Sequence, residues 1–462
     1  MTLVLQAAPL LALLSLLAAG RAGPVGACLV ALGLALPAAL ASLPAGVDFA
    51  GFLLAEAGRG VFLALQPVAG VAGGLLFHAA VSGSGEAAAR PATAARIFAV
   101  TLPLGAFLES VTGFAVGAVF ALSALRGMGI AGAVGGALAL QALVLVPWGG
   151  LGPGTSLGAA LAGLPGHDVA LVAAWPNAAW LLLLAPLLWA MMRRAGVVVS
   201  AAEKLAQLGL LGLMAAVLLL ANLYLPFEVA GVLATGIGVV LALWRADPPS
   251  EWRGPLRAAA PYLLLTAGIL LARLWRDPPA LRPFAEFPGF PLTHVAVVLW
   301  LVALGLLWRG GALDRAGPAL ARARRPALAM LLYVLLGRVL AGSGAAAGLA
   351  QALAEAMGGL APYAVPVMGL VSGIVTGSNV GSNAALMSIQ AGLGQAAGLP
   401  AALAAGVHNF AGGAGAGMSF GVTAMLCALL ADGTRPAQLW RLLLPSMAMV
   451  VVLGWAAMAL LR

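Results

Sequence analysis

A short polar stretch interrupts the apolar second half of the chain. Residues 375–384 read Val-Thr-Gly-Ser-Asn-Val-Gly-Ser-Asn-Ala and stand between the apolar runs 365–371 and 384–389. Unpaired polar groups are costly in hydrocarbon, so broken backbone at membrane depth survives where protein or a cavity surrounds it. We expect a discontinuous helix over 376–383 that holds a small solute, although a small-residue helix-packing seam is the alternative. The candidate solute-binding residues are Thr376, Ser378, Asn379, Ser382 and Asn383.

One carboxylate stands inside the apolar run 97–125. Glu109 is the only acidic residue of that run, and Thr112 and Gly113 follow it as further polar or helix-breaking candidates for solute binding. Ionisable groups within membrane segments are rare because charge is expensive there, and they commonly mark proton or ion pathways. We interpret Glu109 as a proton carrier. The alternative is a structural, protonated carboxyl bonded to a backbone carbonyl.

Two basic side chains and a glycine-rich stretch complete the candidate solute-binding residues. Arg338 interrupts the apolar run 328–340. Its guanidinium could bind a carboxylate with two hydrogen bonds or could instead extend to the membrane interface. His408 precedes a glycine-rich break at 410–421, and a structural hydrogen-bonded histidine is the alternative to a binding role. The glycines expected to contact the solute are Gly412, Gly413 and Gly415.

The composition predicts the fold class that must position these residues. The 462 residues are 63% hydrophobic and 8% charged, with apolar runs from end to end. Soluble domains carry about 25% charged residues, so we expect an all-α polytopic membrane protein with roughly 12–14 hydrophobic segments. The first apolar segment, 3–20, lacks a basic leader region and is expected to be a retained membrane helix.

The net charge of +9 does not indicate a nucleic-acid partner. The arginines cluster in short loops, as the positive-inside rule predicts, and lipid is the expected surrounding of the remaining surface. The clusters lie at 21, 90–96, 193–204, 245–257 and 309–325.

Breaks recur at matching places in the two halves of the chain. The interruption at 109–113 precedes a Gly/Pro/Ser break at 148–156, and the interruption at 376–383 precedes the break at 410–421. Paired broken segments are typical of transporters built from two related halves, with the binding site near the bilayer midplane between them. The approximate halves are 1–225 and 226–462.

Other function classes find less support in the sequence. Ser156 and Ser419 each stand in a Gly-x-Ser-x-Gly string, which a membrane-embedded serine hydrolase would need, but no strand–turn–helix context surrounds them. Cys28 and Cys427 have no metal-binding spacing, and the chain has no phosphate-binding loop or dinucleotide loop. We therefore expect no enzyme activity, no cofactor and no metal.

The same segments resemble the L-lactate permease family. Residues 105–114, Gly-Ala-Phe-Leu-Glu-Ser-Val-Thr-Gly-Phe, resemble that family's Phe-Leu-Glu signature, and 376–384 is similar to its Thr-Gly-Ser-Asp segment. Residues 260–266 and 411–418 match more loosely. The resemblance implies a proton-coupled symporter of lactate and related 2-hydroxymonocarboxylates such as glycolate in a prokaryotic cytoplasmic (inner) membrane. Transport of another small organic anion, such as a sulfonate or a dicarboxylate, is the alternative.

Two positions depart from the family pattern. Asn379 stands where the family has aspartate, and Gly417 stands where it has lysine. Removing one partner of a buried ion pair costs about 3–5 kcal/mol, whereas removing both preserves neutrality. We infer that the two positions form a pair in the family that was lost together here. Arg338 is a candidate to replace the missing lysine.

Overall fold

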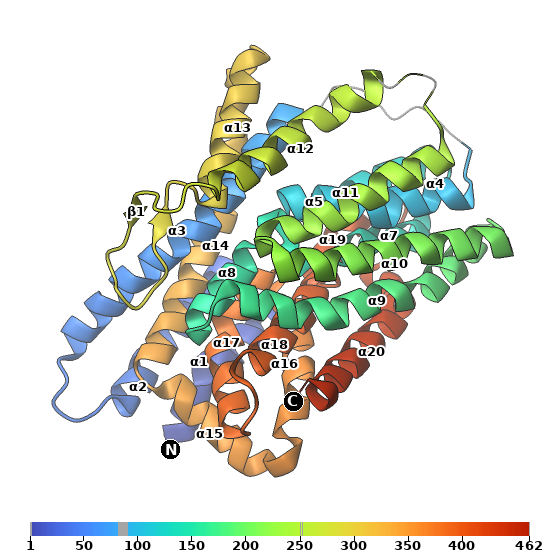
Figure 1. Ribbon diagram of the computed structural model, residues 1–462. Coiled ribbons are helices and arrows are strands. Elements are labelled where there is room, and N and C mark those ends of the chain that lie inside the picture. The colour runs from blue at the N-terminus through green and yellow to red at the C-terminus, as the bar shows by residue number, and fades with distance from the viewer. Residues whose placement is uncertain (1, 82–90, 250, 252, 462) are drawn as a thin grey trace.

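The computed structural model describes residues 2–81, 91–249, 251 and 253–461 and shows an almost entirely helical molecule (Figure 1). Within this part of the chain, 11 helical segments are long and apolar enough to cross a membrane, and four shorter apolar helices accompany them. The one sheet in the described residues pairs β1 (Ala280–Leu281) with β2 (Phe290–Pro291). The chain is therefore an all-α, multi-pass membrane protein, as its composition predicts.

The first half contains ten α-helices in its described residues. They are α1 (Thr2–Ala18), α2 (Pro24–Ser42), α3 (Phe49–Val81), α4 (Ala94–Ala99), α5 (Gly105–Thr112), α6 (Val116–Gly127), α7 (Gly132–Leu140), α8 (Pro153–Ala162), α9 (Gly166–Arg194) and α10 (Ala201–Tyr224). A π-helical turn, Val100–Leu104, joins α4 to α5 around Pro103, which cannot donate a backbone hydrogen bond. Two 3₁₀ segments, Gln141–Leu143 and Val146–Leu151, lie between α7 and α8.

The described residues of the second half contain ten more α-helices. They are α11 (Phe227–Ala246), α12 (Arg253–Ala272), α13 (Val295–Arg309), α14 (Ala316–Gly342), α15 (Ala345–Met357), α16 (Ala361–Thr376), α17 (Asn379–Ala396), α18 (Ala401–Gly417), α19 (Phe420–Leu430) and α20 (Pro436–Leu460). Short 3₁₀ turns, Leu313–Arg315 and Gly358–Leu360, precede α14 and α16.

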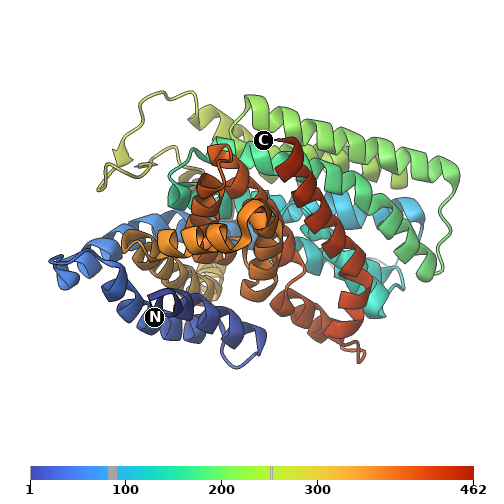
Figure 2. The ribbon, with the colours of Figure 1, turned by 90° about the horizontal axis from the view of Figure 1, so that it is seen from below.

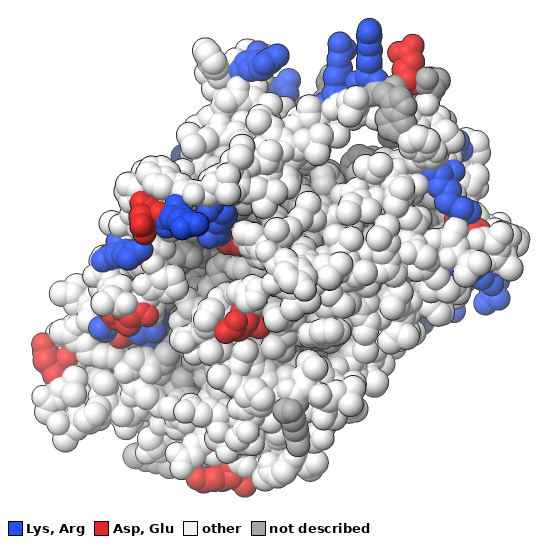
Figure 3. All heavy atoms as spheres, in the orientation of Figure 1, with Lys and Arg blue, Asp and Glu red and all other residues white. Residues whose placement is uncertain are grey.

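The helices form two flanks around a central group. On one flank α3 and α14 lie side by side, with α13 and the α1–α2 pair packed against them (Figure 1). On the other flank α9, α10 and α11 form a layer, and α16, α17 and α18 lie between the flanks (Figure 1 and Figure 2). A broad area of the face in Figure 3 carries no Lys, Arg, Asp or Glu among the described residues, as contact with lipid requires.

Both halves place the same kinds of element in the same order. In the first half a hairpin (α5–α6) is followed by a broken segment (α7–α8) and a long helix (α9). In the second half the hairpin α16–α17, the broken segment α18–α19 and the long helix α20 follow one another. Paired breaks therefore occur where the sequence spacing predicts them.

The expected break at 410–421 is much shorter than predicted. Residues 410–417 are helical, and α18 and α19 are separated only by Met418 and Ser419. The glycines serve close packing instead: a Cβ on Gly415 would lie 2.2 Å from the backbone oxygen of Leu370, and one on Gly412 would lie 2.4 Å from Ser382 Oγ. Small residues of this kind allow membrane helices to approach closely.

Candidate functional site

The first-half hairpin turns through a strained backbone. Gly113, Phe114 and Ala115 have φ values of 70°, 60° and 58°. Residues with a Cβ rarely adopt this region. At the end of α5, Thr112 Oγ1 donates to the Leu108 backbone oxygen at 2.6 Å. Such strain persists where the surrounding structure imposes it, and it clusters at functional sites.

The second-half hairpin turns at Gly377 and Ser378. Gly377 has a φ of 70°. The Ser378 hydroxyl accepts a hydrogen bond from the Gly381 backbone N–H at 3.4 Å, which caps α17. The two arms are joined by a 2.6 Å hydrogen bond between the hydroxyls of Ser372 and Ser382. The predicted discontinuity is thus present, but it is confined to two residues, and Asn379, Ser382 and Asn383 belong to α17.

Four chain breaks meet at one cavity of about 330 Å³. The α5–α6 turn contributes Gly113 to Ala115, and the segment before α8 contributes Gly149 and Gly150. The α16–α17 turn contributes Thr376 to Val380, and the α18–α19 break contributes residues on both of its sides. The remaining lining residues include Gly70 and Val71 of α3, Met330 of α14 and Met425 of α19.

The electrostatics of this cavity favour a negative charge. The N-termini of α6, α8, α17 and α19 all reach it, and a helix N-terminus carries a partial positive charge with unpaired N–H groups. Among the described residues that line the cavity, none is a lysine, arginine or histidine, and Glu109 is the only charged one. Backbone dipoles, rather than cationic side chains, would therefore hold an anion here.

Glu109 lies at the boundary between this cavity and α6. Its side chain is 5% exposed. The Ala115 N–H donates to its Oε1 at 3.2 Å, and the Gly117 N–H donates to its Oε2 at 3.3 Å. The carboxyl thus accepts hydrogen bonds from the first turn of α6, rather than donating to a backbone carbonyl as the alternative interpretation had it.

An asparagine network joins the two halves beside the cavity. Asn409 Oδ1 accepts from Asn379 Nδ2 at 3.0 Å and from Asn383 Nδ2 at 2.9 Å. Asn383 Nδ2 also donates to the Gly154 backbone oxygen at 2.8 Å, and Asn409 Nδ2 donates to Thr155 Oγ1 at 2.9 Å. The Oδ1 atoms of Asn379 and Asn383 are buried without a hydrogen-bond partner among the described residues. Asn379 lines the cavity, and its buried Oδ1 is an unsatisfied acceptor in the cavity wall.

No protein-family model matches the chain, and no curated protein matches it significantly.

The predicted residues divide into those that line the cavity and those that do not. Glu109, Thr112, Gly113, Thr376, Ser378 and Asn379 line it. Ser382, Asn383, Gly412, Gly413, Gly415, Arg338 and His408 lie outside the lining. His408 is fully buried, with Nε2 3.5 Å from Ser382 Oγ. The glycines pack helices together; a Cβ on Gly413 would lie 2.7 Å from Pro147 Cδ.

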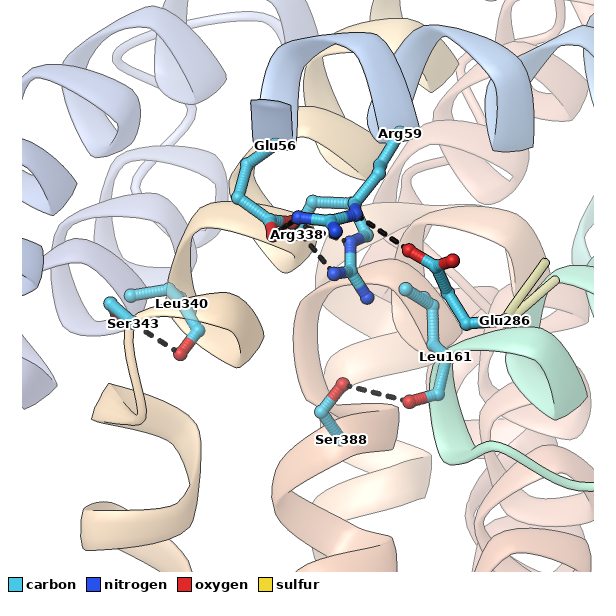
Figure 4. A network of polar contacts seen from close by, with 8 residues as sticks. All are labelled: Glu56, Arg59, Leu161, Glu286, Arg338, Leu340, Ser343 and Ser388. Carbon is cyan, nitrogen blue, oxygen red and sulfur yellow. Dashed lines mark hydrogen bonds and ion pairs between the residues drawn. The ribbon is translucent and has the colours of Figure 1, made fainter. Parts of the chain in front are cut away.

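Arg338 does not line the cavity and belongs instead to an ion cluster with Glu56, Arg59 and Glu286 (Figure 4). Its Nη2 and Nε lie 2.7 and 2.9 Å from Oε2 of Glu56 on α3. Arg59 Nη1 lies 2.8 Å from Glu56 Oε1, and Arg59 Nε lies 2.8 Å from Oε1 of Glu286, in the segment between α12 and α13. The Arg338 guanidinium also covers the ring of Phe287, 5.0 Å from its centroid, which is a favourable cation–π arrangement.

Some lining and supporting residues were not among the predicted ones. Gly149, Gly150 and Gly154 belong to the recognised first-half break, and that break was the available signal for including them. Asn409 holds the network together, and its amide within an apolar helix could have identified it. No sequence pattern pointed to Met330 or Met425, because their role depends on tertiary packing.

The two serines of the Gly-x-Ser-x-Gly strings have local structural roles. Ser156 Oγ donates to the Gly152 backbone oxygen at 3.3 Å. Ser419 Oγ accepts from the Val422 N–H at 3.2 Å and so caps the start of α19. Neither hydroxyl has a hydrogen bond to a histidine in the described part of the chain.

Proposed function

We propose that the protein is a secondary active transporter that moves a small organic anion together with a proton. The observation that carries this proposal is the meeting of four chain breaks, two from each half, at one cavity, which is the arrangement typical of transporters with paired broken helices. Eleven apolar helical segments in the described residues provide the scaffold that such a transporter needs.

The cavity chemistry favours a carboxylate. Four helix N-termini supply partial positive charge. Of these, α8 begins without a side-chain cap, so the N–H groups that follow Pro153 in its first turn lack a side-chain partner. Asn379 Oδ1 has no hydrogen-bond donor in the described residues, and a solute hydroxyl could supply one after a small rotation of the amide. These features suit a hydroxy acid, and the resemblance to the lactate permeases suggests lactate or glycolate in a prokaryotic cytoplasmic membrane.

Glu109 is the proposed proton carrier. It is the only charged residue that lines the cavity in the described part of the chain, and it is almost fully buried. Transfer of one monoanion with one proton carries no net charge, so the pH gradient would drive it without a contribution from the membrane potential.

The two departures from the family pattern fit the same proposal. Asn379 and Gly417, the positions of the family's aspartate and lysine, both line this cavity. A Cβ on Gly417 would lie 2.9 Å from the Leu143 backbone oxygen. A lysine at position 417 would therefore require Leu143 to move.

Uptake into proteoliposomes tests the proposal. Labelled lactate or glycolate should accumulate under an inward acid gradient, and a protonophore should abolish the accumulation. A panel containing a short sulfonate and a dicarboxylate identifies the anion class, and a preferred anion should also raise the melting temperature of the purified protein. Absence of both uptake and thermal stabilisation across the whole panel would overturn the proposal.

A further inference from the structure

A carboxylate of the protein itself, the Glu109 side chain, is already bound to a helix N-terminus at the cavity. Glu109 occupies the N-terminus of α6 through the N–H groups of Ala115 and Gly117. The N-termini of α17 and α19 are capped differently, by the neutral hydroxyls of Ser378 and Ser419. Among the helix starts at the cavity, α6 alone is capped by an ionisable group in the described residues.

The cavity extends to Glu109 and to Ala115, one of its two donors, because both residues line it. Gly149 faces it without a side chain: a Cβ built there would lie 3.7 Å from Glu109 Oε1, at ordinary contact distance. Gly149, Glu109 and Asn379 all line the cavity. A solute in the cavity therefore has a route to the α6 N-terminus.

We propose that the solute's carboxylate takes the place of the Glu109 carboxylate at the Ala115 and Gly117 N–H groups, and that it does so only when Glu109 carries a proton. This inference rests on the proposed transport function and states how the two fluxes are coupled. The proton bonds to a carboxylate oxygen of Glu109, and the neutral carboxyl releases the two backbone donors to the incoming anion.

Charge balance explains why the proton is required. The N-terminus of α6 is equivalent to roughly half a positive charge, and its Ala115 and Gly117 N–H groups already bind the Glu109 carboxylate. A second carboxylate at the same two donors would therefore lie against an ionised Glu109. Two like charges within a few ångströms of each other strongly disfavour simultaneous ionisation. One proton must therefore enter with each anion, and release of the proton returns Glu109 to α6 and expels the solute.

No titratable side chain on the neighbouring elements that the structure describes is bonded to Glu109. The elements packed against α5 are α3, α6, α11 and the segments at 100–104 and 141–151. Their titratable side chains are Glu56, Arg59 and His78 of α3, Arg126 of α6, and Glu228 and Arg245 of α11. Glu228 pairs with Arg273, and Arg245 pairs with Glu203. None of these side chains is in hydrogen-bond or ion-pair contact with Glu109 in the described structure.

Proton uptake by the wild-type protein is the direct test. At a pH above the range in which Glu109 titrates, addition of lactate, or of the anion that the uptake panel selects, to purified protein in weakly buffered solution should remove about one proton from solution per anion bound. Above the range in which Glu109 titrates, the affinity should fall about tenfold for each pH unit. Anion binding without proton uptake would overturn the inference while leaving the transport function intact. Absence of any binding would instead count against the transport function.

The Glu109→Gln variant provides the second test. The neutral amide imitates the protonated acid, so bound anion should exchange across the membrane at equal pH, and its affinity should no longer depend on pH. Accumulation driven by an acid gradient should be lost. If the variant bound the anion with the wild-type pH dependence, another group would be the proton site. Should the variant not fold, the proton-uptake measurement on the wild type still decides.

Discussion

Two buried glutamates in this molecule have similar exposure but opposite surroundings. Glu56 is 3% exposed and Glu109 is 5% exposed. Glu56 is held by the guanidinium groups of Arg59 and Arg338, and Arg59 continues to Glu286 (Figure 4). Glu109 has only two backbone N–H groups as hydrogen-bond donors in the described structure.

The difference shows how the same side chain can serve structure or chemistry. The four charges of this cluster, with Glu56 counted among them, sum to zero, and they join α3 to α14 and to the segment before α13. Removing the charge of Glu56 would leave a neighbouring arginine without its partner, so Glu56 has a structural role. Glu109 has no such partner in the described residues, and its charge can be exchanged for that of a ligand.

The largest effect is expected from giving Glu109 a cation of its own. Gly149 has φ −57° and ψ 134°, which any residue can adopt, and its missing side chain faces Glu109. Gly149→Lys should place an ammonium in the cavity, keep Glu109 ionised and reduce gradient-driven uptake to background. Gly149→Ala measures the steric cost alone, and uptake by the alanine variant should exceed that of the lysine variant at least about tenfold, because a nearby cation lowers the pKa of a carboxyl by about one unit or more. Equal uptake by the two variants would contradict the comparison.

A smaller but clear effect is expected from breaking the Glu56 pair. Arg338→Met should destabilise the protein by about 3 kcal/mol, the lower end of the range for broken buried ion pairs, because Arg59 remains. The matched control is the double variant Glu56→Gln, Arg338→Met, which restores neutrality and should recover part of the loss in thermal unfolding. A double variant less stable than the single one would show that burial, rather than charge pairing, dominates.

Two helix-capping serines, one in the cavity wall and one outside it, allow the effect on stability to be measured separately from the effect on solute binding. Ser378→Ala and Ser200→Ala each remove a hydroxyl that accepts a backbone N–H at a helix start, at 3.4 and 3.2 Å. Each should cost about 1 kcal/mol. Of the two, only Ser378 lines the cavity, so only its variant should also weaken anion affinity in titrations. Equal affinities would remove Ser378 from the binding site.

The smallest effect is expected at the exposed end of the ion cluster. Its own backbone N–H, and then the Arg59 guanidinium, hold the pKa of Glu286 below its ordinary value. Because the folded pKa is lower, the stabilisation is present above about pH 4.3 and is lost as the pH falls through the lowered value. Glu286→Gln should therefore lower the melting temperature slightly at pH 7 and low salt, and high salt or acid should abolish the difference. A salt-independent difference would refute an electrostatic origin.

The sequence predicted the positions of the helix breaks better than it predicted which side chains contact each other. Polar residues inside apolar runs are conspicuous, so the turns near Glu109 and Ser378 could be located without a structure. The partner of Arg338 could not be located from the sequence, because Glu56 lies 282 positions away. Hydropathy indicates how deeply a residue is buried, and it does not indicate which residue it contacts. The glycines at 410–417 were expected to break the chain, but glycine serves both turns and close helix packing, and only tertiary structure distinguishes them.

The close backbone contacts in each half have a mechanical consequence. A Cβ on Gly117 would lie 2.1 Å from the Gly105 oxygen, and one on Gly373 would lie 2.0 Å from the Gly412 oxygen. Helices packed this closely cannot slide past each other without losing the contact. The pair α5 and α6 therefore moves as one rigid body, and so does the pair α16 and α18. Any reorientation of the protein across the bilayer therefore has to occur at the boundaries between these pieces, and the cavity occupies that boundary.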